Sequence, residues 1–217
     1  MTNPQQASRT SLPRNVFWLL CSRAARSVAQ GVLAVDFALY LRSLQWSGSE
    51  IGSVLAMGLV FGVTLTIATS MASDRFGRKK FLLAYDTAYV IACLSAIVST
   101  NNFVLAAAAV AGSFGRGANG SAGPFSALEK AWMTQGLNPA QWTRVLSLNT
   151  TVGFLGMALG AALGSIPGFL HLGSPVESSS YSIVFLIALV AGAMSLLFLT
   201  LADDQHRPIR GARPKLV

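Results

Sequence analysis

The chain has 217 residues, of which 53% are hydrophobic and only 11% are charged, whereas charged residues make up roughly 25% of an ordinary soluble domain. This composition excludes an ordinary soluble domain and predicts that most of the chain lies in lipid. The net charge of +8 could suggest a nucleic-acid-binding protein, but that function needs basic residues gathered on one water-facing surface. Here they fall mostly in the segments between apolar runs, so we expect no nucleic-acid partner.

Six apolar segments are each long enough to cross a hydrocarbon layer about 30 Å thick at about 1.5 Å per residue. We predict an all-α membrane protein with an N-terminal tail (1–14), a basic C-terminal tail or linker (203–217) and six transmembrane helices between them. The helices are expected over residues 15–41, 51–71, 81–99, 103–128, 145–170 and 181–202. Each triplet of helices opens with an arginine-bearing helix, as an inverted three-plus-three repeat would.

The first expected helix is the least apolar of the six. Arg23, Arg26 and Gln30 fall within about 60° of one another on a helix of 3.6 residues per turn, so they form one polar stripe that faces away from lipid. Asp36 projects to a different side, nearer the outer end.

The second and third helices are joined by a short charged turn. Gly77 allows the backbone to reverse there, and Asp74 at the end of a helix needs a nearby cation or another helix N-terminus. Any polytopic protein could carry a positive-inside turn of this kind. The residue order Asp-Arg-x-Gly-Arg-Lys is a more specific signal than a generic charged turn. It is formed here by Asp74, Arg75, Gly77, Arg78 and Lys79, followed by Lys80.

This turn resembles the loop signature of the major facilitator superfamily of secondary transporters, Gly-x-Leu-Ala-Asp-Arg-x-Gly-Arg-Arg/Lys. The match departs at Ser70 and Ala72, where the family usually has Gly and Leu. In the fourth helix, the run that begins at Arg116 resembles the family signature Arg-x-x-Gln-Gly-x-Gly-Ala, with Asn119 in place of Gln. The resemblance implies that the first and fourth helices line a central cavity, and that the arginine of the fourth helix serves proton coupling and cavity electrostatics.

An ionised side chain at the bilayer centre costs on the order of 3 kcal/mol unless it faces a cavity or a partner. We therefore hypothesise a buried, wet site, and the alternative is that the arginines pair with Asp36, Asp86 or Glu129 only to hold helices in register. Two or three arginines would suit an anionic solute, or a titrating carboxylate such as Asp36 or Glu129. The candidate cavity residues are Arg23, Arg26, Gln30, Asp36, Arg116, Asn119 and Glu129.

The fifth helix carries glycines at Gly153, Gly156, Gly160 and Gly164, and their spacing is a packing signal for a neighbouring helix. Proton antiporters of the superfamily usually have a Gly-Pro pair in this helix. Here the only proline is Pro167, so the resemblance does not imply drug:proton antiport. No soluble enzyme constellation and no cofactor or metal site is recognised, and a membrane-embedded enzyme stays an open alternative.

The charge pattern predicts the orientation. With six spans and a cytoplasmic N-terminus, twelve Lys and Arg residues lie inside and only Arg42 lies outside, so both termini are expected in the cytoplasm, with the chain in a bacterial inner membrane. Major facilitators normally have twelve helices in two halves, so this chain is expected to be an N-terminal half that needs a second half or a homodimer. The predicted function is secondary transport of a small solute by alternating access, and the alternative is a non-transporting module or regulator derived from a transporter half.

Overall fold

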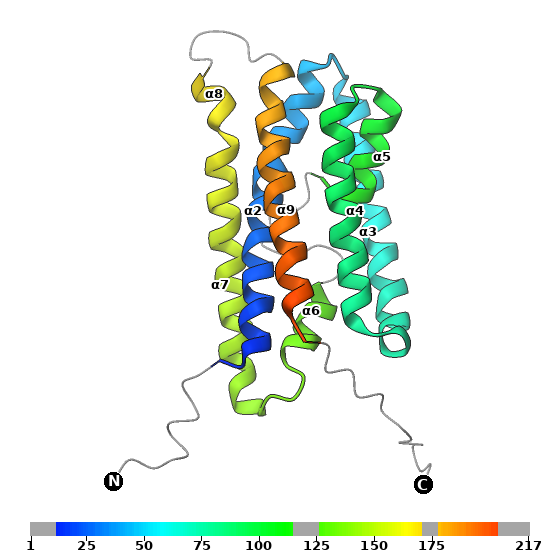
Figure 1. Ribbon diagram of the computed structural model, residues 1–217. Coiled ribbons are helices and arrows are strands. Elements are labelled where there is room, and N and C mark those ends of the chain that lie inside the picture. Colours follow the sequence, from blue (N-terminus) through cyan, green and yellow to red (C-terminus); the bar gives the residue numbers. More distant parts are fainter. Residues whose placement is uncertain (1–11, 115–125, 171–177, 204–217) are drawn as a thin grey trace, which may run out of the picture.

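A computed structural model describes residues 12–114, 126–170 and 178–203, and all regular secondary structure within those ranges is helical. Figure 1 shows the helices running side by side in one bundle. The elements are α2 (Arg14–Ser43), α3 (Gly48–Phe76), α4 (Arg78–Val98), α5 (Asn102–Gly112), α6 (Ser126–Met133), α7 (Pro139–Gly164), α8 (Ile166–Leu170), the 3-10 turn η2 (Ser178–Tyr181) and α9 (Ser182–Leu201).

Five stretches in the described residues are long and apolar enough to cross a membrane: Arg14–Ser43, Gly48–Ser73, Arg78–Val98, Pro139–Phe169 and Ser182–Leu201. They correspond to the expected first, second, third, fifth and sixth spans. The continuous helix expected over 103–128 is corrected, because α5 ends at Gly112 and Ser113 takes a left-handed conformation with φ of 55°. A second helix, α6, begins at Ser126. The intervening residues 115–125, which include Arg116 and Asn119, lie outside the described residues.

The start of α7 also differs from the expectation. The helix begins at Pro139, six residues before the expected start at Val145. The reason is local: the Asn138 side chain accepts a hydrogen bond from the Ala140 N–H at 3.2 Å, and proline is well suited to the first helical position. A polar sequence with a good cap and a proline at this position is therefore a helix start.

Helix α2 packs against α7 and α9, while α3, α4 and α5 form a group on the other side of the bundle (Figure 1). The glycine face of α7 lies directly on α2, as the glycine spacing predicted. A Cβ on Gly160 would lie 2.9 Å from the backbone nitrogen of Val32, and one on Gly156 would lie 3.0 Å from the carbonyl oxygen of Ala24. The absence of side chains at these positions lets the two backbones approach closely.

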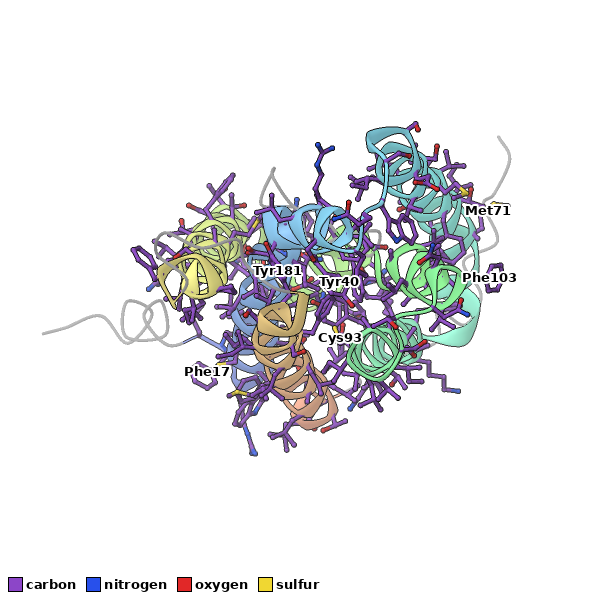
Figure 2. All side chains as sticks on the ribbon, turned by 90° about the horizontal axis from the view of Figure 1, so that it is seen from above. Phe17, Tyr40, Met71, Cys93, Phe103 and Tyr181 are labelled. Atoms are coloured by element: carbon purple, nitrogen blue, oxygen red, sulfur yellow. The ribbon has the colours of Figure 1, made fainter. Side chains whose placement is uncertain are left out.

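Two hydrophobic clusters fill the interior at different heights. One contains Phe37, Tyr40 and Phe185 toward the end where α2 finishes, and Figure 2 shows Tyr40 and Tyr181 lying together there, with their ring centroids 5.8 Å apart. The other contains Leu19, Leu82, Trp132 and Leu199. Most buried polar residues of α2, α4 and α9 fall between the two clusters, namely Ser22, Arg23, Arg26, Ser27, Asp86 and Ser195.

The outward surface of the bundle is apolar. Met71 and Phe103 are each 81% exposed, and Figure 2 shows both pointing away from the bundle. A soluble protein rarely exposes apolar patches of this kind, so this surface fits contact with lipid. The start of α2, the α3–α4 turn and the end of α9 lie at the same end of the bundle (Figure 1), which is called the basic end below because Arg14, Arg78, Lys79 and Lys80 are there.

Candidate functional site

The candidate site is a polar layer between the two hydrophobic clusters. Helices α2, α4, α6 and α9 each contribute at least one side chain to it. The side chains are Ser22, Arg26, Asp86, Glu129 and Ser195, and each of these residues is at most 3% exposed. Charged groups at this depth are stable only when they are paired and hydrogen-bonded.

Arg26 holds the layer together from the middle of α2. Its Nε lies 3.1 Å from Oδ1 of Asp86, and its Nη1 donates to Oε2 of Glu129 at 2.9 Å. Its Nη2 donates to Oγ of Ser22 at 3.1 Å and to Oδ2 of Asp86 at 3.4 Å. One guanidinium therefore joins two carboxylates from two other helices, and its planar fork of donors suits this task better than a lysine would.

Two serines close the network into a ring. The Ser195 hydroxyl donates to Oδ2 of Asp86 at 2.7 Å, and the Oγ atoms of Ser22 and Ser195 lie 3.0 Å apart. Because the Ser195 proton is directed to Asp86, Ser22 must donate to Ser195 while it accepts from Arg26. Such closed networks strengthen each bond and fix the positions of the helices that carry them.

Arg23 lies on the same polar stripe of α2 but faces α7. It is 2% exposed, and a Cβ on Gly153 would lie 3.0 Å from its Cζ atom. Gly153 is thus needed at this position because it leaves room for the guanidinium. Among the described residues, Arg23 and Arg26 bring two positive charges to the interior of this region, and Asp86 and Glu129 bring two negative charges.

Several buried acceptors of the layer have no hydrogen-bond partner in the part of the chain that the structure describes. They are Gln30 Oε1, Glu129 Oε1 and Asn149 Oδ1, together with the Ser27 hydroxyl. Leaving such a group unsatisfied costs about 1–3 kcal/mol. These atoms can accept hydrogen bonds from water or from a solute that carries donors.

The other candidate cavity residues stand apart from this network. Asp36 is 9% exposed and lies against Gly164 of α7, nearer the opposite end of α2. It makes no ion pair with a described residue. Arg116 and Asn119 fall in 115–125, outside the described residues.

The charged turn between α3 and α4 is tied to the neighbouring helix ends. Gly77 has φ of 90°, so it reverses the backbone in a conformation that favours glycine. The Arg78 guanidinium donates to the carbonyl of Ala131 at 2.8 Å, and Lys79 Nζ donates to the carbonyls of Thr200 and Ala202 at 2.9 and 2.6 Å. Asp74 and Arg75 lie in the last turn of α3.

Asp86, Ser22 and Ser195 are site residues that were not predicted from the sequence. Asp86 was considered only as a structural partner of the arginines, and the structure pairs it with Arg26. The signal for Asp86 was available, because it is the only charged residue in the apolar run 81–99. Ser22 precedes Arg26 by one helical turn, whereas nothing in the sequence links Ser195 to α2.

Comparisons with known proteins complete these observations. The family model described as Major Facilitator Superfamily matches residues 19–216. The chain is also 25% identical over 190 residues to a protein of Escherichia coli strain K12 named as the uncharacterized MFS-type transporter YdeE, and the match covers 87% of this chain and 44% of that protein. The chain thus spans about half the length of this curated relative.

Proposed function

Because this chain belongs to the major facilitator superfamily, we propose that it forms the six-helix half of a secondary transporter that moves a small solute across the membrane by alternating access. The relative that it matches is about twice as long, which supports a second half, or a second copy, as the partner that completes the pathway. The basic end is proposed to face the cytoplasm of a bacterium, because cytoplasmic loops are enriched in Lys and Arg.

The observation that carries the proposal is the polar layer built around Arg26. Ionisable groups inside a membrane bundle are costly and generally serve a pathway or a relay. A purely structural lock would need only one carboxylate for one arginine, whereas Arg26 binds both Asp86 and Glu129. The second carboxylate leaves the Arg26 group with a net negative charge that Arg23 offsets at a distance.

The second carboxylate on Arg26 supports the coupling of solute transport to the movement of an ion. Protonation of Glu129 would leave Arg26 paired with Asp86 alone, so the link between α6 and α2 would weaken while the link between α4 and α2 stayed intact. Coupled transport requires a structural element with two conformations whose populations shift when one group gains or loses a proton. Arg116 remains a second candidate for coupling, on the family resemblance.

The solute is proposed to meet the stripe that extends from Arg23 to Gln30. Arg23 and Arg26 together balance Asp86 and Glu129, so an anionic solute would depend on a further positive charge, for which Arg116 is the candidate on the family resemblance. Gln30 Oε1 and Asn149 Oδ1 are acceptors, and they favour a solute that also carries hydroxyl or amino donors. A small hydroxy acid or an amino acid would carry both the negative charge and the hydrogen-bond donors.

The experiment uses proteoliposomes that contain the protein as its gene encodes it and a trapped pH dye. Sugars, organic acids, amino acids and lipophilic cations are added outside one class at a time, and the change in internal pH is recorded. We expect one class to drive a proton flux, and Glu129→Gln to reduce that flux to the level of empty liposomes. The matched control is Asp203→Asn, an exposed carboxylate beyond the end of α9.

A flux that survives Glu129→Gln unchanged would remove this carboxylate from coupling. If no class of solute is moved under any ion gradient by a folded protein, the alternative gains support, namely a non-transporting module that acts through a partner protein.

A further inference from the structure

A groove opens at the surface of the bundle between α3, α4 and the end of α5. It encloses about 380 Å³ and is lined almost entirely by apolar atoms. Its lining includes Leu65, Ala68 and Ala72 from α3, Ala84 and Ala88 from α4, and Ala111 from α5. These alanines are too small to fill the space between the helices.

The groove continues along α4. A second hollow of about 380 Å³ lies between α4 and α5 and shares Ala88 and Ala111 with the first. From Phe81 in the first hollow to Ser95 in the second, α4 rises about 21 Å at 1.5 Å per residue. One leaflet of the hydrocarbon layer is about 15 Å thick, so the groove is long enough for a chain that runs through one leaflet.

The basic end of the groove carries a lysine with no described partner. Lys80 directly precedes Phe81 and lies one turn before Ala84, and its side chain is exposed. It makes no ion pair with a described residue. Its neighbours Arg78 and Lys79 donate to backbone carbonyls and add positive charge at this end of the bundle.

We propose that this groove seats one acyl chain of an anionic phospholipid, with the phosphate of its head group at Lys80. The charge at the basic end is complementary to an anionic head group, and the apolar walls match an acyl chain. A transmembrane helix of a partner would be a poor occupant, because a helix with side chains is about 10–12 Å in diameter. A channel between two adjacent helices that is floored by alanines fits a thinner chain.

The test measures lipid binding to the purified protein in detergent by native mass spectrometry. Palmitoyl-oleoyl phosphatidylglycerol is titrated against phosphatidylcholine with the same acyl chains. We expect Lys80→Gln to lower the affinity for phosphatidylglycerol about fivefold, the effect of one lysine at an anionic membrane surface, and to lower the affinity for phosphatidylcholine clearly less, because its choline group leaves the head group without net charge. Ala84→Trp fills the groove and should weaken the binding of both lipids.

Matched controls keep the result interpretable. Lys130→Gln removes an exposed lysine from α6 at the same end of the bundle, and Leu186→Trp places a tryptophan on the exposed side of α9, away from the groove. Elution volume and far-UV circular dichroism verify folding, and Ala88→Leu provides a second, milder filling of the groove. Equal effects of Lys80→Gln and Lys130→Gln, or of Ala84→Trp and Leu186→Trp, would overturn the proposal. It would also be overturned if Ala84→Trp and Ala88→Leu disrupted a dimer and left lipid binding intact.

Discussion

The substitution Arg26→Met separates the electrostatic contribution of the polar layer from its packing. Methionine retains most of the apolar stem but removes every donor, so Asp86 and Glu129 are left as two uncompensated carboxylates that are 2% and 1% exposed. Removing one partner of a buried ion pair costs about 3–5 kcal/mol. Since folded proteins are stable by only about 5–15 kcal/mol, we expect a large loss of stability.

The companion variant combines Arg26→Met with Asp86→Asn and Glu129→Gln. It removes the charge from all three groups at similar volume, and replacing a complete buried ion network is often close to neutral. We therefore expect the triple variant to recover most of the stability that the single variant loses, while solute-driven proton flux remains absent.

The assay is unfolding in mixed micelles of dodecyl maltoside and increasing sodium dodecyl sulfate. Far-UV circular dichroism follows the helices, and tryptophan fluorescence follows the four tryptophans, among them the buried Trp132 of the cluster that also contains Leu82. A single variant within about 1 kcal/mol of wild type would show that Arg26 does not compensate the two carboxylates as the 2.9 and 3.1 Å contacts imply, because breaking a buried pair costs more than that. A triple variant as unstable as the single one would assign the loss to the arginine's own packing and hydrogen bonds.

Three further predictions concern helix packing and helix ends. Gly160→Leu should prevent α7 from packing closely on α2, because even the leucine Cβ would lie 2.9 Å from the Val32 nitrogen. The yield of folded protein should therefore fall. The control Gly168→Ala should leave the yield unchanged, because a Cβ at that position meets no atom within 4 Å. Lys79→Met should remove the donor to two carbonyls at the end of α9 and cost about 1 kcal/mol, visible as faster hydrogen exchange in the last turn of α9. Trp46→Phe should remove the 3.2 Å bond from Trp46 Nε1 to Asn102 Oδ1 and lower stability in the mixed-micelle assay by a similar amount, about 1 kcal/mol.

The polar stripe of α2 could be predicted from the sequence because it depends on helical period alone. Arg23, Arg26 and Gln30 share one side of any regular helix. The free-energy cost of placing charged side chains in hydrocarbon excludes lipid as the neighbour of that side. The glycine face of α7 was predictable for the same reason, since Gly156 and Gly160 mark a close approach before the partner helix is known.

The pairing within the polar layer could not be predicted in this way. Asp86 and Ser195 are separated by 109 residues, and their contact depends on how α4 and α9 are rotated about their own axes. The end of α5 at Gly112 was also missed, because Ser113 in a left-handed conformation has no sequence signal comparable to a proline. Periodicity identifies a buried face, whereas the partner of that face is decided by the packing of the whole bundle.

The arrangement of the layer bears on how a transporter could tolerate so many buried charges. The hydrophobic clusters above and below it fix α2, α4 and α9 through apolar contacts, so the ions are not required to hold those three helices together. Helix α6 has only eight residues; Leu128, Trp132 and Met133 join it to the cluster that also contains Leu82, and Glu129 adds the ion pair with Arg26. A change at Glu129 would therefore act first on the shortest helix of the site. Movement of α6 relative to α2, α4 and α9 would break the ion pair between Arg26 and Glu129 and leave the serine ring closed, and its main further cost would be the exposure of the apolar side chains that α6 contributes to that cluster.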